Sequence, residues 1–189
     1  VGSLSPVFSA TSINYTASVS YATTSMTVTP TRAQADATVT VNGTPVMSGT
    51  PSGAIPLPVG TTPITILVTA QDGTTTKTYT LNVTRAAPSN NANLANLTAS
   101  VGTLTPSFDT AIIDYSANVS NSTTSMAVTP ILAQTDATLT VNGTAVTSGA
   151  SSAEIPLAVG VTPITIHVTA QDGTTTKTYT LNVTRDAPL

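Results

Sequence analysis

The stretch QDGTTTKTYTLNVTR, at residues 71–85, decides the fold, because it recurs without a change at residues 171–185. Within it, Asp72-Gly73 stands between two runs that alternate apolar and polar residues, which is the strongest short-range signal of a β-hairpin. Residues n and n+100 are identical at 61 of the 89 pairs that align positions 1–89 with positions 101–189 without a gap. The chain therefore contains two tandem copies of one domain.

The second copy begins with a segment that the first copy does not have. Residues 90–100, NNANLANLTAS, precede Val101, and within them Leu97 and Ala99 alternate with polar residues. This alternation predicts a first strand. We therefore expect the first copy to lack its first strand and to have an open sheet edge, which can pair with another chain. We also expect a piece of a longer array, with one domain at residues 1–86, a linker at 87–92 and a second domain at 93–189.

Alternation with a period of two runs through both copies and predicts strands with one buried face. It is clearest at residues 113–119, 137–142, 164–169 and 178–183. Asn-Gly and Asp-Gly at 42–43 and 72–73, and again 100 residues later, predict tight hairpin turns because these residues tolerate positive φ. The prolines are expected to end strands or to lie on edges. The pattern predicts an all-β protein with two tandem immunoglobulin-like antiparallel β-sandwiches of about seven strands, the first without its first strand.

Composition narrows the classes of function. Only 7% of the 189 residues are charged, against a usual fraction of about 25%, and 42 threonines supply much of the polar surface. The net charge of −3 offers no basic face for nucleic acid. No stretch resembles a spanning helix, so we expect no membrane insertion. A Thr-rich, Lys-poor chain without cysteine is typical of a bacterial surface or secreted protein.

Each copy resembles the cadherin-like β-sandwich repeat of bacterial surface and secreted proteins. The residues that carry the resemblance in the second copy are VGTLTPSF at 101–108, Tyr115 with Val119, ATLTVNG at 137–143, IPL at 155–157 with Gly160, and residues 164–173 and 178–185. It implies seven strands and further copies of the same repeat as partners. It also implies that such repeats occur in the same proteins as wall-anchoring, fibronectin-like and glycoside-hydrolase modules, from which carbohydrate binding has been suggested. The clustered acids of calcium-dependent cadherins are absent from the sequence.

No set of residues in the sequence predicts catalysis or a cofactor. Calcium needs six to eight oxygens with several carboxylates, whereas residues 86–93 offer amides and no acid. The single histidine, His167, is expected on the outward face of its strand as a surface residue. One histidine and eight dispersed acids assemble neither an activated nucleophile nor a glycosidase pair. We therefore expect no enzyme, no cofactor and no metal site.

Two further possibilities are a crosslink and a sugar site. A Lys–Asn crosslink would need Lys77 or Lys177 buried beside an acid, and solvated lysines are expected instead. A sugar site commonly uses exposed aromatic rings, and Tyr21 is the one aromatic residue without an aromatic counterpart, since Asn121 takes its place. The tyrosines expected in the core are Tyr15, Tyr79, Tyr115 and Tyr179.

The sequence predicts a structural or adhesive repeat module of a bacterial extracellular or cell-surface protein, acting as a stalk or spacer. One alternative is a carbohydrate-binding module whose partners are extracellular glycans. Another is a subunit of a filament that assembles by homotypic contact through the open edge of the first copy. The ligand-binding residues are unknown from sequence. Differences that could carry a specific function lie at Tyr21/Asn121, Arg32/Leu132 and Gly53/Ala153.

Overall fold

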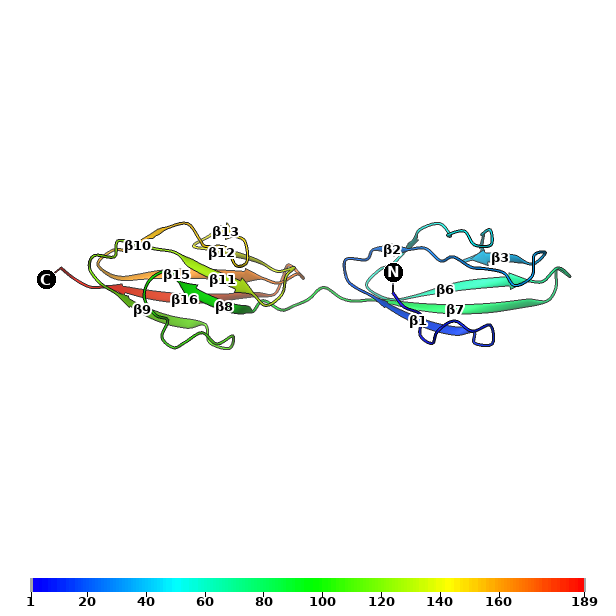
Figure 1. The fold of residues 1–189 in the computed structure, drawn as a ribbon, viewed down its shortest axis with the longest axis horizontal. Coiled ribbons are helices and arrows are strands. Elements are labelled where there is room, and N and C mark those ends of the chain that lie inside the picture. Colours follow the sequence, from blue (N-terminus) through cyan, green and yellow to red (C-terminus); the bar gives the residue numbers. More distant parts are fainter. Residues whose placement is uncertain (1, 189) are drawn as a thin grey trace. The chain divides into compact units, whose positions relative to one another are not determined.

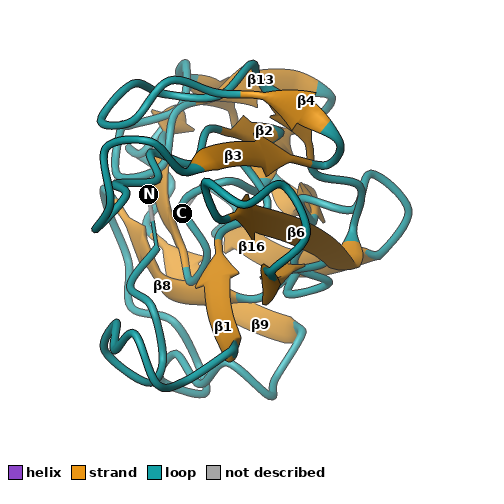
Figure 2. Cartoon of the chain, turned by 90° about the vertical axis from the view of Figure 1, so that its right-hand side faces the viewer, coloured by secondary structure: helices purple, strands orange, loops and turns teal. Residues whose placement is uncertain are grey.

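A computed structural model describes residues 2–188 and divides them between two compact units, unit 1 within Val1–Ala87 and unit 2 within Pro88–Leu189. Strands, turns and loops make up residues 2–188, without a helix (Figure 2). Within these residues there is accordingly no helix that could cross a membrane. The predicted all-β class with two tandem sandwiches is confirmed. The linker at residues 87–92 stays a prediction.

Unit 1 has a five-stranded sheet in the order β1-β7-β6-β3-β4, and a short second layer formed by the pair β2-β5 (Figure 1). The strands are β1 Asn14–Val19, β2 Ser25–Met26, β3 Thr38–Val41, β4 Thr44–Pro45, β5 Ile55–Pro56, β6 Gly60–Thr69 and β7 Thr76–Arg85. Met26 and Ile55 of the short pair pack against the core that lies on the large sheet.

Unit 2 repeats this sheet in the order β13-β12-β15-β16-β9, and its second layer contains two pairs, β10-β14 and β8-β11. The strands are β8 Leu94–Ala99, β9 Asp114–Val119, β10 Ser125–Met126, β11 Val128–Leu132, β12 Thr138–Val141, β13 Thr144–Val146, β14 Ile155–Pro156, β15 Gly160–Thr169 and β16 Thr176–Arg185. The predicted strand in the lead-in segment is β8.

Most neighbouring strands run antiparallel, as predicted. The exception in each unit is the pair formed by the large-sheet strands that come first and last along the chain. β1 pairs with β7 in parallel over six positions, and β9 pairs with β16 in the same way. The chain leaves β1 into the second layer and returns to the sheet before β7, so the two strands meet side by side in the same direction. Period-two alternation does not report strand direction, which is why the sequence did not indicate this pairing.

Both predicted β-hairpins form, but only the Asn-Gly pair makes the predicted tight turn. Asn42 and Gly43 have φ values of 47° and 80° and join β3 to β4 as a two-residue turn. The Asp-Gly pair instead lies in a six-residue loop, 70–75, between β6 and β7. The Asp72 carboxylate accepts hydrogen bonds from the backbone N–H groups of Thr74 and Thr75 at 2.9 and 2.8 Å. This Asx-type loop replaces the tight turn.

Pro63 lies inside β6, opposite Asn82, and not at the end of a strand. It is tolerated because β3 pairs only with the stretch from Ile66 to Thr69. At Pro63, β6 therefore has a partner strand on one side only, and the missing N–H can face the open side, as on an edge strand.

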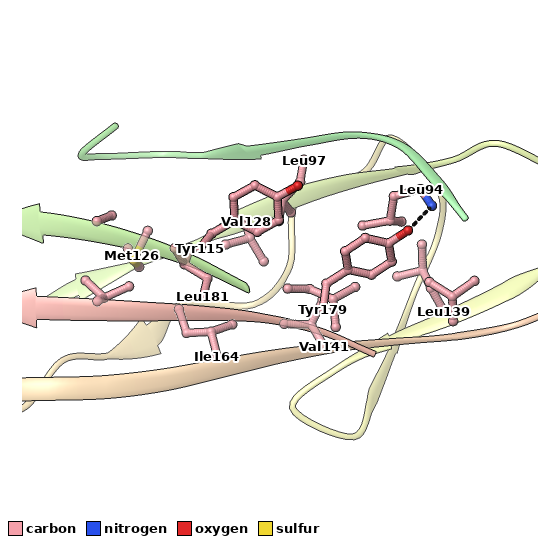
Figure 3. Packing of buried hydrophobic residues seen from close by; sticks show 14 of the residues in the cluster. Leu94, Leu97, Tyr115, Met126, Val128, Leu139, Val141, Ile164, Tyr179 and Leu181 are labelled. Atoms are coloured by element: carbon pink, nitrogen blue, oxygen red, sulfur yellow. Dashed lines mark hydrogen bonds between the residues drawn. The ribbon is translucent and has the colours of Figure 1, made fainter. Parts of the chain in front are cut away.

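Strand β8 closes the core of unit 2. It pairs antiparallel with β11, and its side chains Leu94 and Leu97 are 0% and 2% exposed. Figure 3 shows both leucines over the large sheet, with Tyr179 and Leu181 of β16 beneath them. The Tyr179 hydroxyl accepts a hydrogen bond from the Leu94 N–H at 3.0 Å. The strand therefore covers apolar surface and satisfies polar groups at the same time.

Unit 1 has no strand at the place of β8 among its described residues, and its residues 28–32, the counterparts of β11, form no strand. The side chains that β8 covers in unit 2 are correspondingly less buried in unit 1. We call the set below the open face of unit 1; each member is half-buried, and each counterpart in unit 2 is buried. The open face consists of Met26, Val28, Pro30, Ile66, Val68 and Tyr79. Tyr79 is therefore only partly in the core, contrary to expectation, whereas Tyr179 is fully buried.

The open face predicts that unit 1 is less stable than unit 2. Residues 71–85 and 171–185 have the same sequence, so unprotected amides within them exchange hydrogen at nearly the same rate. We expect the amides of Leu81 and Val83 to exchange faster than those of Leu181 and Val183, corresponding to an opening free energy lower by roughly 2–5 kcal/mol because two leucine side chains are missing from the core. Hydrogen exchange of the whole chain, followed by NMR, measures this. Equal or greater protection in unit 1 would contradict it.

Candidate functional site

Tyr21, the candidate for a sugar platform, lies against an arginine. Arg85, at the end of β7, donates from Nε and Nη2 to the Tyr21 carbonyl at 2.8 and 2.6 Å, and from Nη1 to the Leu57 carbonyl at 3.0 Å. Its guanidinium carbon lies 4.7 Å from the centre of the Tyr21 ring. One face of the ring is therefore occupied by the protein itself, which leaves less of it for stacking on a sugar.

The same arginine bridge is present in unit 2 without the aromatic ring. Arg185 donates to the Asn121 carbonyl at 2.9 and 2.6 Å and to the Leu157 carbonyl at 2.8 Å. The planar guanidinium suits two carbonyls in neighbouring segments. Arg85 and Arg185 thus tie the last strand of each sheet to the loop after β1 or β9, a structural role that the sequence did not indicate.

The two lysines of the identical hairpins have different partners. Lys177 Nζ donates to Asn93 Oδ1 at 3.0 Å and to the Thr110 carbonyl at 2.7 Å. Lys77 Nζ donates to the Ala10 carbonyl. The expectation of purely solvated lysines is therefore incomplete, because each ammonium group holds a backbone carbonyl. The partners of Lys177 are an amide and a carbonyl, so the acid that a Lys–Asn crosslink requires is not among them.

The strand-anchoring cluster of unit 2 consists of Asn93, Thr110, Lys177 and Tyr179. Thr110 Oγ1 donates to the Leu94 carbonyl at 2.9 Å, next to the hydrogen bond from the Leu94 N–H to Tyr179 and the one from Lys177 to Asn93. Together these side chains fix the beginning of β8 on the sheet. Residues 93 and 177 are far apart in sequence, and no local motif signals that they meet.

The remaining titratable residues do not converge. His167 is exposed on β15, as expected, and its Nδ1 lies 3.0 Å from Thr178 Oγ1. Across residues 2–188, no group of three or more His, Asp or Glu side chains is arranged to hold a metal ion. Gln171 and Asp136 form one polar contact at 3.1 Å on the surface of unit 2.

Two depressions in unit 2 lie near the positions at which the copies differ. One, with a volume of about 190 Å³, is lined by residues 152–156, including Ala153 and Glu154, and by the β12-β13 hairpin. The other, of about 350 Å³, is bordered by Leu132 and Ser148. Their linings are apolar and hydroxyl side chains with one amide, Asn142, and one carboxylate, Glu154, which does not define a ligand class.

Tyr21 and Arg85 provide a test of whether the aromatic ring is structural. We expect Tyr21→Asn, which copies unit 2, to lower the free energy of unfolding of unit 1 by about 0.5–1 kcal/mol, the usual value of an exposed cation–π contact. Tyr21→Phe keeps the ring and should leave the stability unchanged. Urea unfolding of the full chain, with the two units resolved by NMR, measures both. If Tyr21→Asn costs nothing, the ring is free for another role.

The loop aspartates predict a pH dependence. A hydrogen bond from the Thr75 hydroxyl, followed by backbone bonds from Thr75 and Thr74, lowers the pKa of Asp72 to about 2, and the Thr175 hydroxyl and the corresponding backbone bonds do the same for Asp172. A pKa below the unfolded value of about 3.9 means that the contribution to stability is complete above that pH and is lost as the pH falls toward 2. NMR titration of the side-chain carboxyl carbons should give midpoints near 2.

Thr75→Ala and Thr175→Ala should raise the pKa of the neighbouring aspartate, because each removes the largest cause of its lowering. The aspartate of the unsubstituted unit serves as an internal control in the same sample. A wild-type midpoint near 4 would show that the loop hydrogen bonds do not persist in solution.

Comparisons with known proteins agree with this architecture. A family model described as "Cadherin-like beta sandwich domain" matches residues 2–86 and again residues 94–186. A protein of Evansella cellulosilytica with the printed name "Putative membrane protein" is 41% identical over 97 residues, which are 51% of this chain and 14% of that protein. The chain thus spans a small part of the length of that relative.

Two solved structures align with this chain at low sequence identity and low TM-score. The titin domains Z1Z2 in complex with telethonin give a TM-score of 0.40 at 11% identity, covering 81% of this chain and 82% of that one. The immunoglobulin domains 1–4 of Sidekick-1 give a TM-score of 0.28 at 12% identity, covering 97% of this chain and 51% of that one. Since the family model matches both units over nearly their whole length, the chain belongs to the cadherin-like β-sandwich domain family and contains two copies of the domain in tandem.

Proposed function

We propose that the chain is a structural repeat module that acts as a stalk or spacer in an extracellular or cell-surface protein of a bacterium. Cadherin-like domains are usually extracellular, and their fold is typically non-catalytic. Family membership therefore supports a structural or adhesive module, and the spacer role rests on the path of the chain through one unit.

The observation that carries the proposal is that the chain enters and leaves unit 2 at opposite ends of β16. At the entering end, Asn93 Oδ1 accepts a hydrogen bond from Lys177 Nζ at 3.0 Å. At the leaving end, β16 finishes at Arg185. Arg185 lies eight positions after Lys177, or roughly 26 Å away at about 3.3 Å per residue. Each copy of the domain can therefore add length to an array instead of folding the chain back.

The pairing of β9 with β16 suits such a role mechanically. The strands are parallel and paired at six positions, from Thr180 opposite Asp114 to Arg185 opposite Val119. Tension between the two ends of the unit loads β8 and its pairing with β11 first. Once β8 has detached, the tension pulls β9 and β16 in opposite directions along their axes. Several backbone hydrogen bonds must then break together, and not one after another.

The mechanical prediction can be tested by single-molecule pulling, because the chain has no cysteine and attachment points can be introduced freely. We expect unit 2 to resist a higher force when it is held through Ser89→Cys and Asp186→Cys than when it is held through Asn121→Cys and Asp186→Cys. The second pair lies at one end, where the Asn121 side chain donates to the Asp186 carbonyl at 2.9 Å, so force there opens β9 and β16 pair by pair.

Equal unfolding forces for the two pairs of attachment points would contradict a role in resisting tension. Binding of a glycan that saturates, and that Tyr21→Ala abolishes, would favour the carbohydrate-binding alternative instead. A glycan array with the whole chain provides that measurement, and we expect it to show no such binding.

A further inference from the structure

We propose that Gln171 holds the segment 88–93 on unit 2, so that the connection between the two units is free to bend only at Ala87. Residues 88–93, which we call the strap, belong to unit 2. The proposal narrows the predicted linker of residues 87–92 to a single free residue. Its meaning for a spacer rests on the proposed function, whereas the attachment of the strap can be tested without it.

Ser89 is the first residue of the strap that is hydrogen-bonded to the body of unit 2. Its N–H donates to Gln171 Oε1 at 2.8 Å, and its carbonyl accepts from the Asp172 N–H at 3.1 Å. Ser89 and Gln171 are both half-buried. Both backbone polar groups of Ser89 therefore have partners in the loop between β15 and β16, as they would in a regular element of structure.

Asp136 sets the direction in which the Gln171 amide points. The amide Nε2 donates to Asp136 Oδ2 at 3.1 Å. An ionised carboxylate only accepts hydrogen bonds, so the NH₂ group of the amide faces Asp136 and the amide oxygen faces the Ser89 N–H. Gln171 is thus a positioning residue that bridges the loop before β12 and the strap.

The strap continues toward β8 through short-range hydrogen bonds. The Asn91 N–H donates to Ser89 Oγ at 3.2 Å, and Asn91 Oδ1 accepts from the Asn93 N–H at 3.0 Å. Ala92 is 5% exposed, and the Asn93 carbonyl accepts from the Ala133 N–H at 2.9 Å. The side chains of this polar segment therefore bind its own backbone, which gives a linker-like composition an ordered structure.

On the other side of Ala87, unit 1 ends in an anchored residue. The Ala86 N–H donates to the Val19 carbonyl at 3.0 Å. The Asp186 N–H donates to the Val119 carbonyl in the same way, at 3.1 Å. An anchor directly after the last strand is therefore a feature of both copies of the domain.

Ala87 lies between the anchored end of unit 1 and the strap. It is exposed, and its backbone makes no hydrogen bond to any part of the chain that the structure describes. Pro88 restricts it further, because proline disfavours the α region for the preceding residue and fixes its own φ at about −65°. The connection can therefore bend through only a few dihedral angles.

Without the hydrogen bond to Gln171, the free segment would extend from Ala87 to Asn91, since Ala92 is the next buried residue. Four further free residues would add up to roughly 14 Å of slack, at about 3.3–3.6 Å per residue. A docked strap thus keeps the length that each domain adds to an array nearly constant, which suits a spacer.

The test measures backbone order by ¹⁵N relaxation of the full chain. We expect amide order parameters of about 0.85 at Ser89 and Asn91, the value of rigid backbone, and a lower value at Ala87. Gln171→Ala should reduce the order parameters of Ser89 and Asn91 to below about 0.6. It should also make the two units tumble faster, because they turn more independently. Gln71→Ala is the matched control, since it changes the identical residue in the loop 70–75 of unit 1.

An exchange of donor and acceptor separates positioning from a general effect on folding. Gln171→Glu still offers an oxygen to the Ser89 N–H but meets the carboxylate of Asp136, so the order parameter of Ser89 should fall. Adding Asp136→Asn supplies a donor to the new carboxylate and should restore that order parameter. Hydrogen exchange of the Leu181 and Val183 amides, which lie in the core of unit 2, establishes that the variants fold.

A low order parameter at Ser89 in the unsubstituted chain, or one that Gln171→Ala leaves unchanged, would overturn the proposal. Release of the strap without faster tumbling of the units would overturn it too, as would a double variant no more ordered than Gln171→Glu. These outcomes are distinct from those of the pulling experiment. Equal unfolding forces together with an ordered strap would reject the resistance to tension and support the attachment of the strap.

Discussion

The packing of each unit depends on how the apolar face of its large sheet is covered. Strand β8 contributes to this cover in unit 2, and the described residues of unit 1 have no equivalent strand. A sheet with one apolar face is stable only when another layer covers that face. In unit 2, β8 completes the second layer with two leucines and a hydrogen bond to Tyr179. In unit 1 the remaining second layer, the pair β2-β5, covers only part of the sheet. The hairpin residues Ile166, Val168 and Tyr179 are buried in unit 2, whereas their counterparts in unit 1 are half-buried, because only unit 2 has this strand.

The identical hairpins show that the same sequence can occupy two environments. Residues 71–85 and 171–185 match in every position, and their turns have the same hydrogen bonds from Thr74 and Thr75 or from Thr174 and Thr175. Local interactions therefore do not distinguish them. Tyr79 and Tyr179 nevertheless differ in burial, because burial is decided by a strand that lies outside the hairpin. Identity between the copies is compatible with recent duplication, and it also preserves the anchors that hold β8.

The features that were predictable from sequence are those with a local or periodic signal. Alternation located the long hairpins and the inward residues such as Tyr115 and Leu181, and the unmatched segment before Val101 located β8. The parallel pairing of β1 with β7 was not predictable, because side-chain periodicity is the same in either direction. The Asp-Gly loop was misassigned because the Asp72 carboxylate organises a longer turn. The contacts of Lys177 with Asn93 and of Arg85 with Tyr21 join residues more than 60 positions apart. They form only in the folded chain, so no local sequence pattern indicates them.

The edge of unit 1 is more polar than the covered edge of unit 2. Thr27, Thr31 and Arg32 stand where unit 2 has Ala127, Ile131 and Leu132. Polar and charged residues, together with Pro30, are common devices that keep an exposed edge from pairing with a copy of itself. The inward-facing Val28, Ile66 and Val68 do not share this change and keep the apolar character of a core. The copies thus differ along this edge, whereas the inward positions keep the residue types that β8 covers in unit 2.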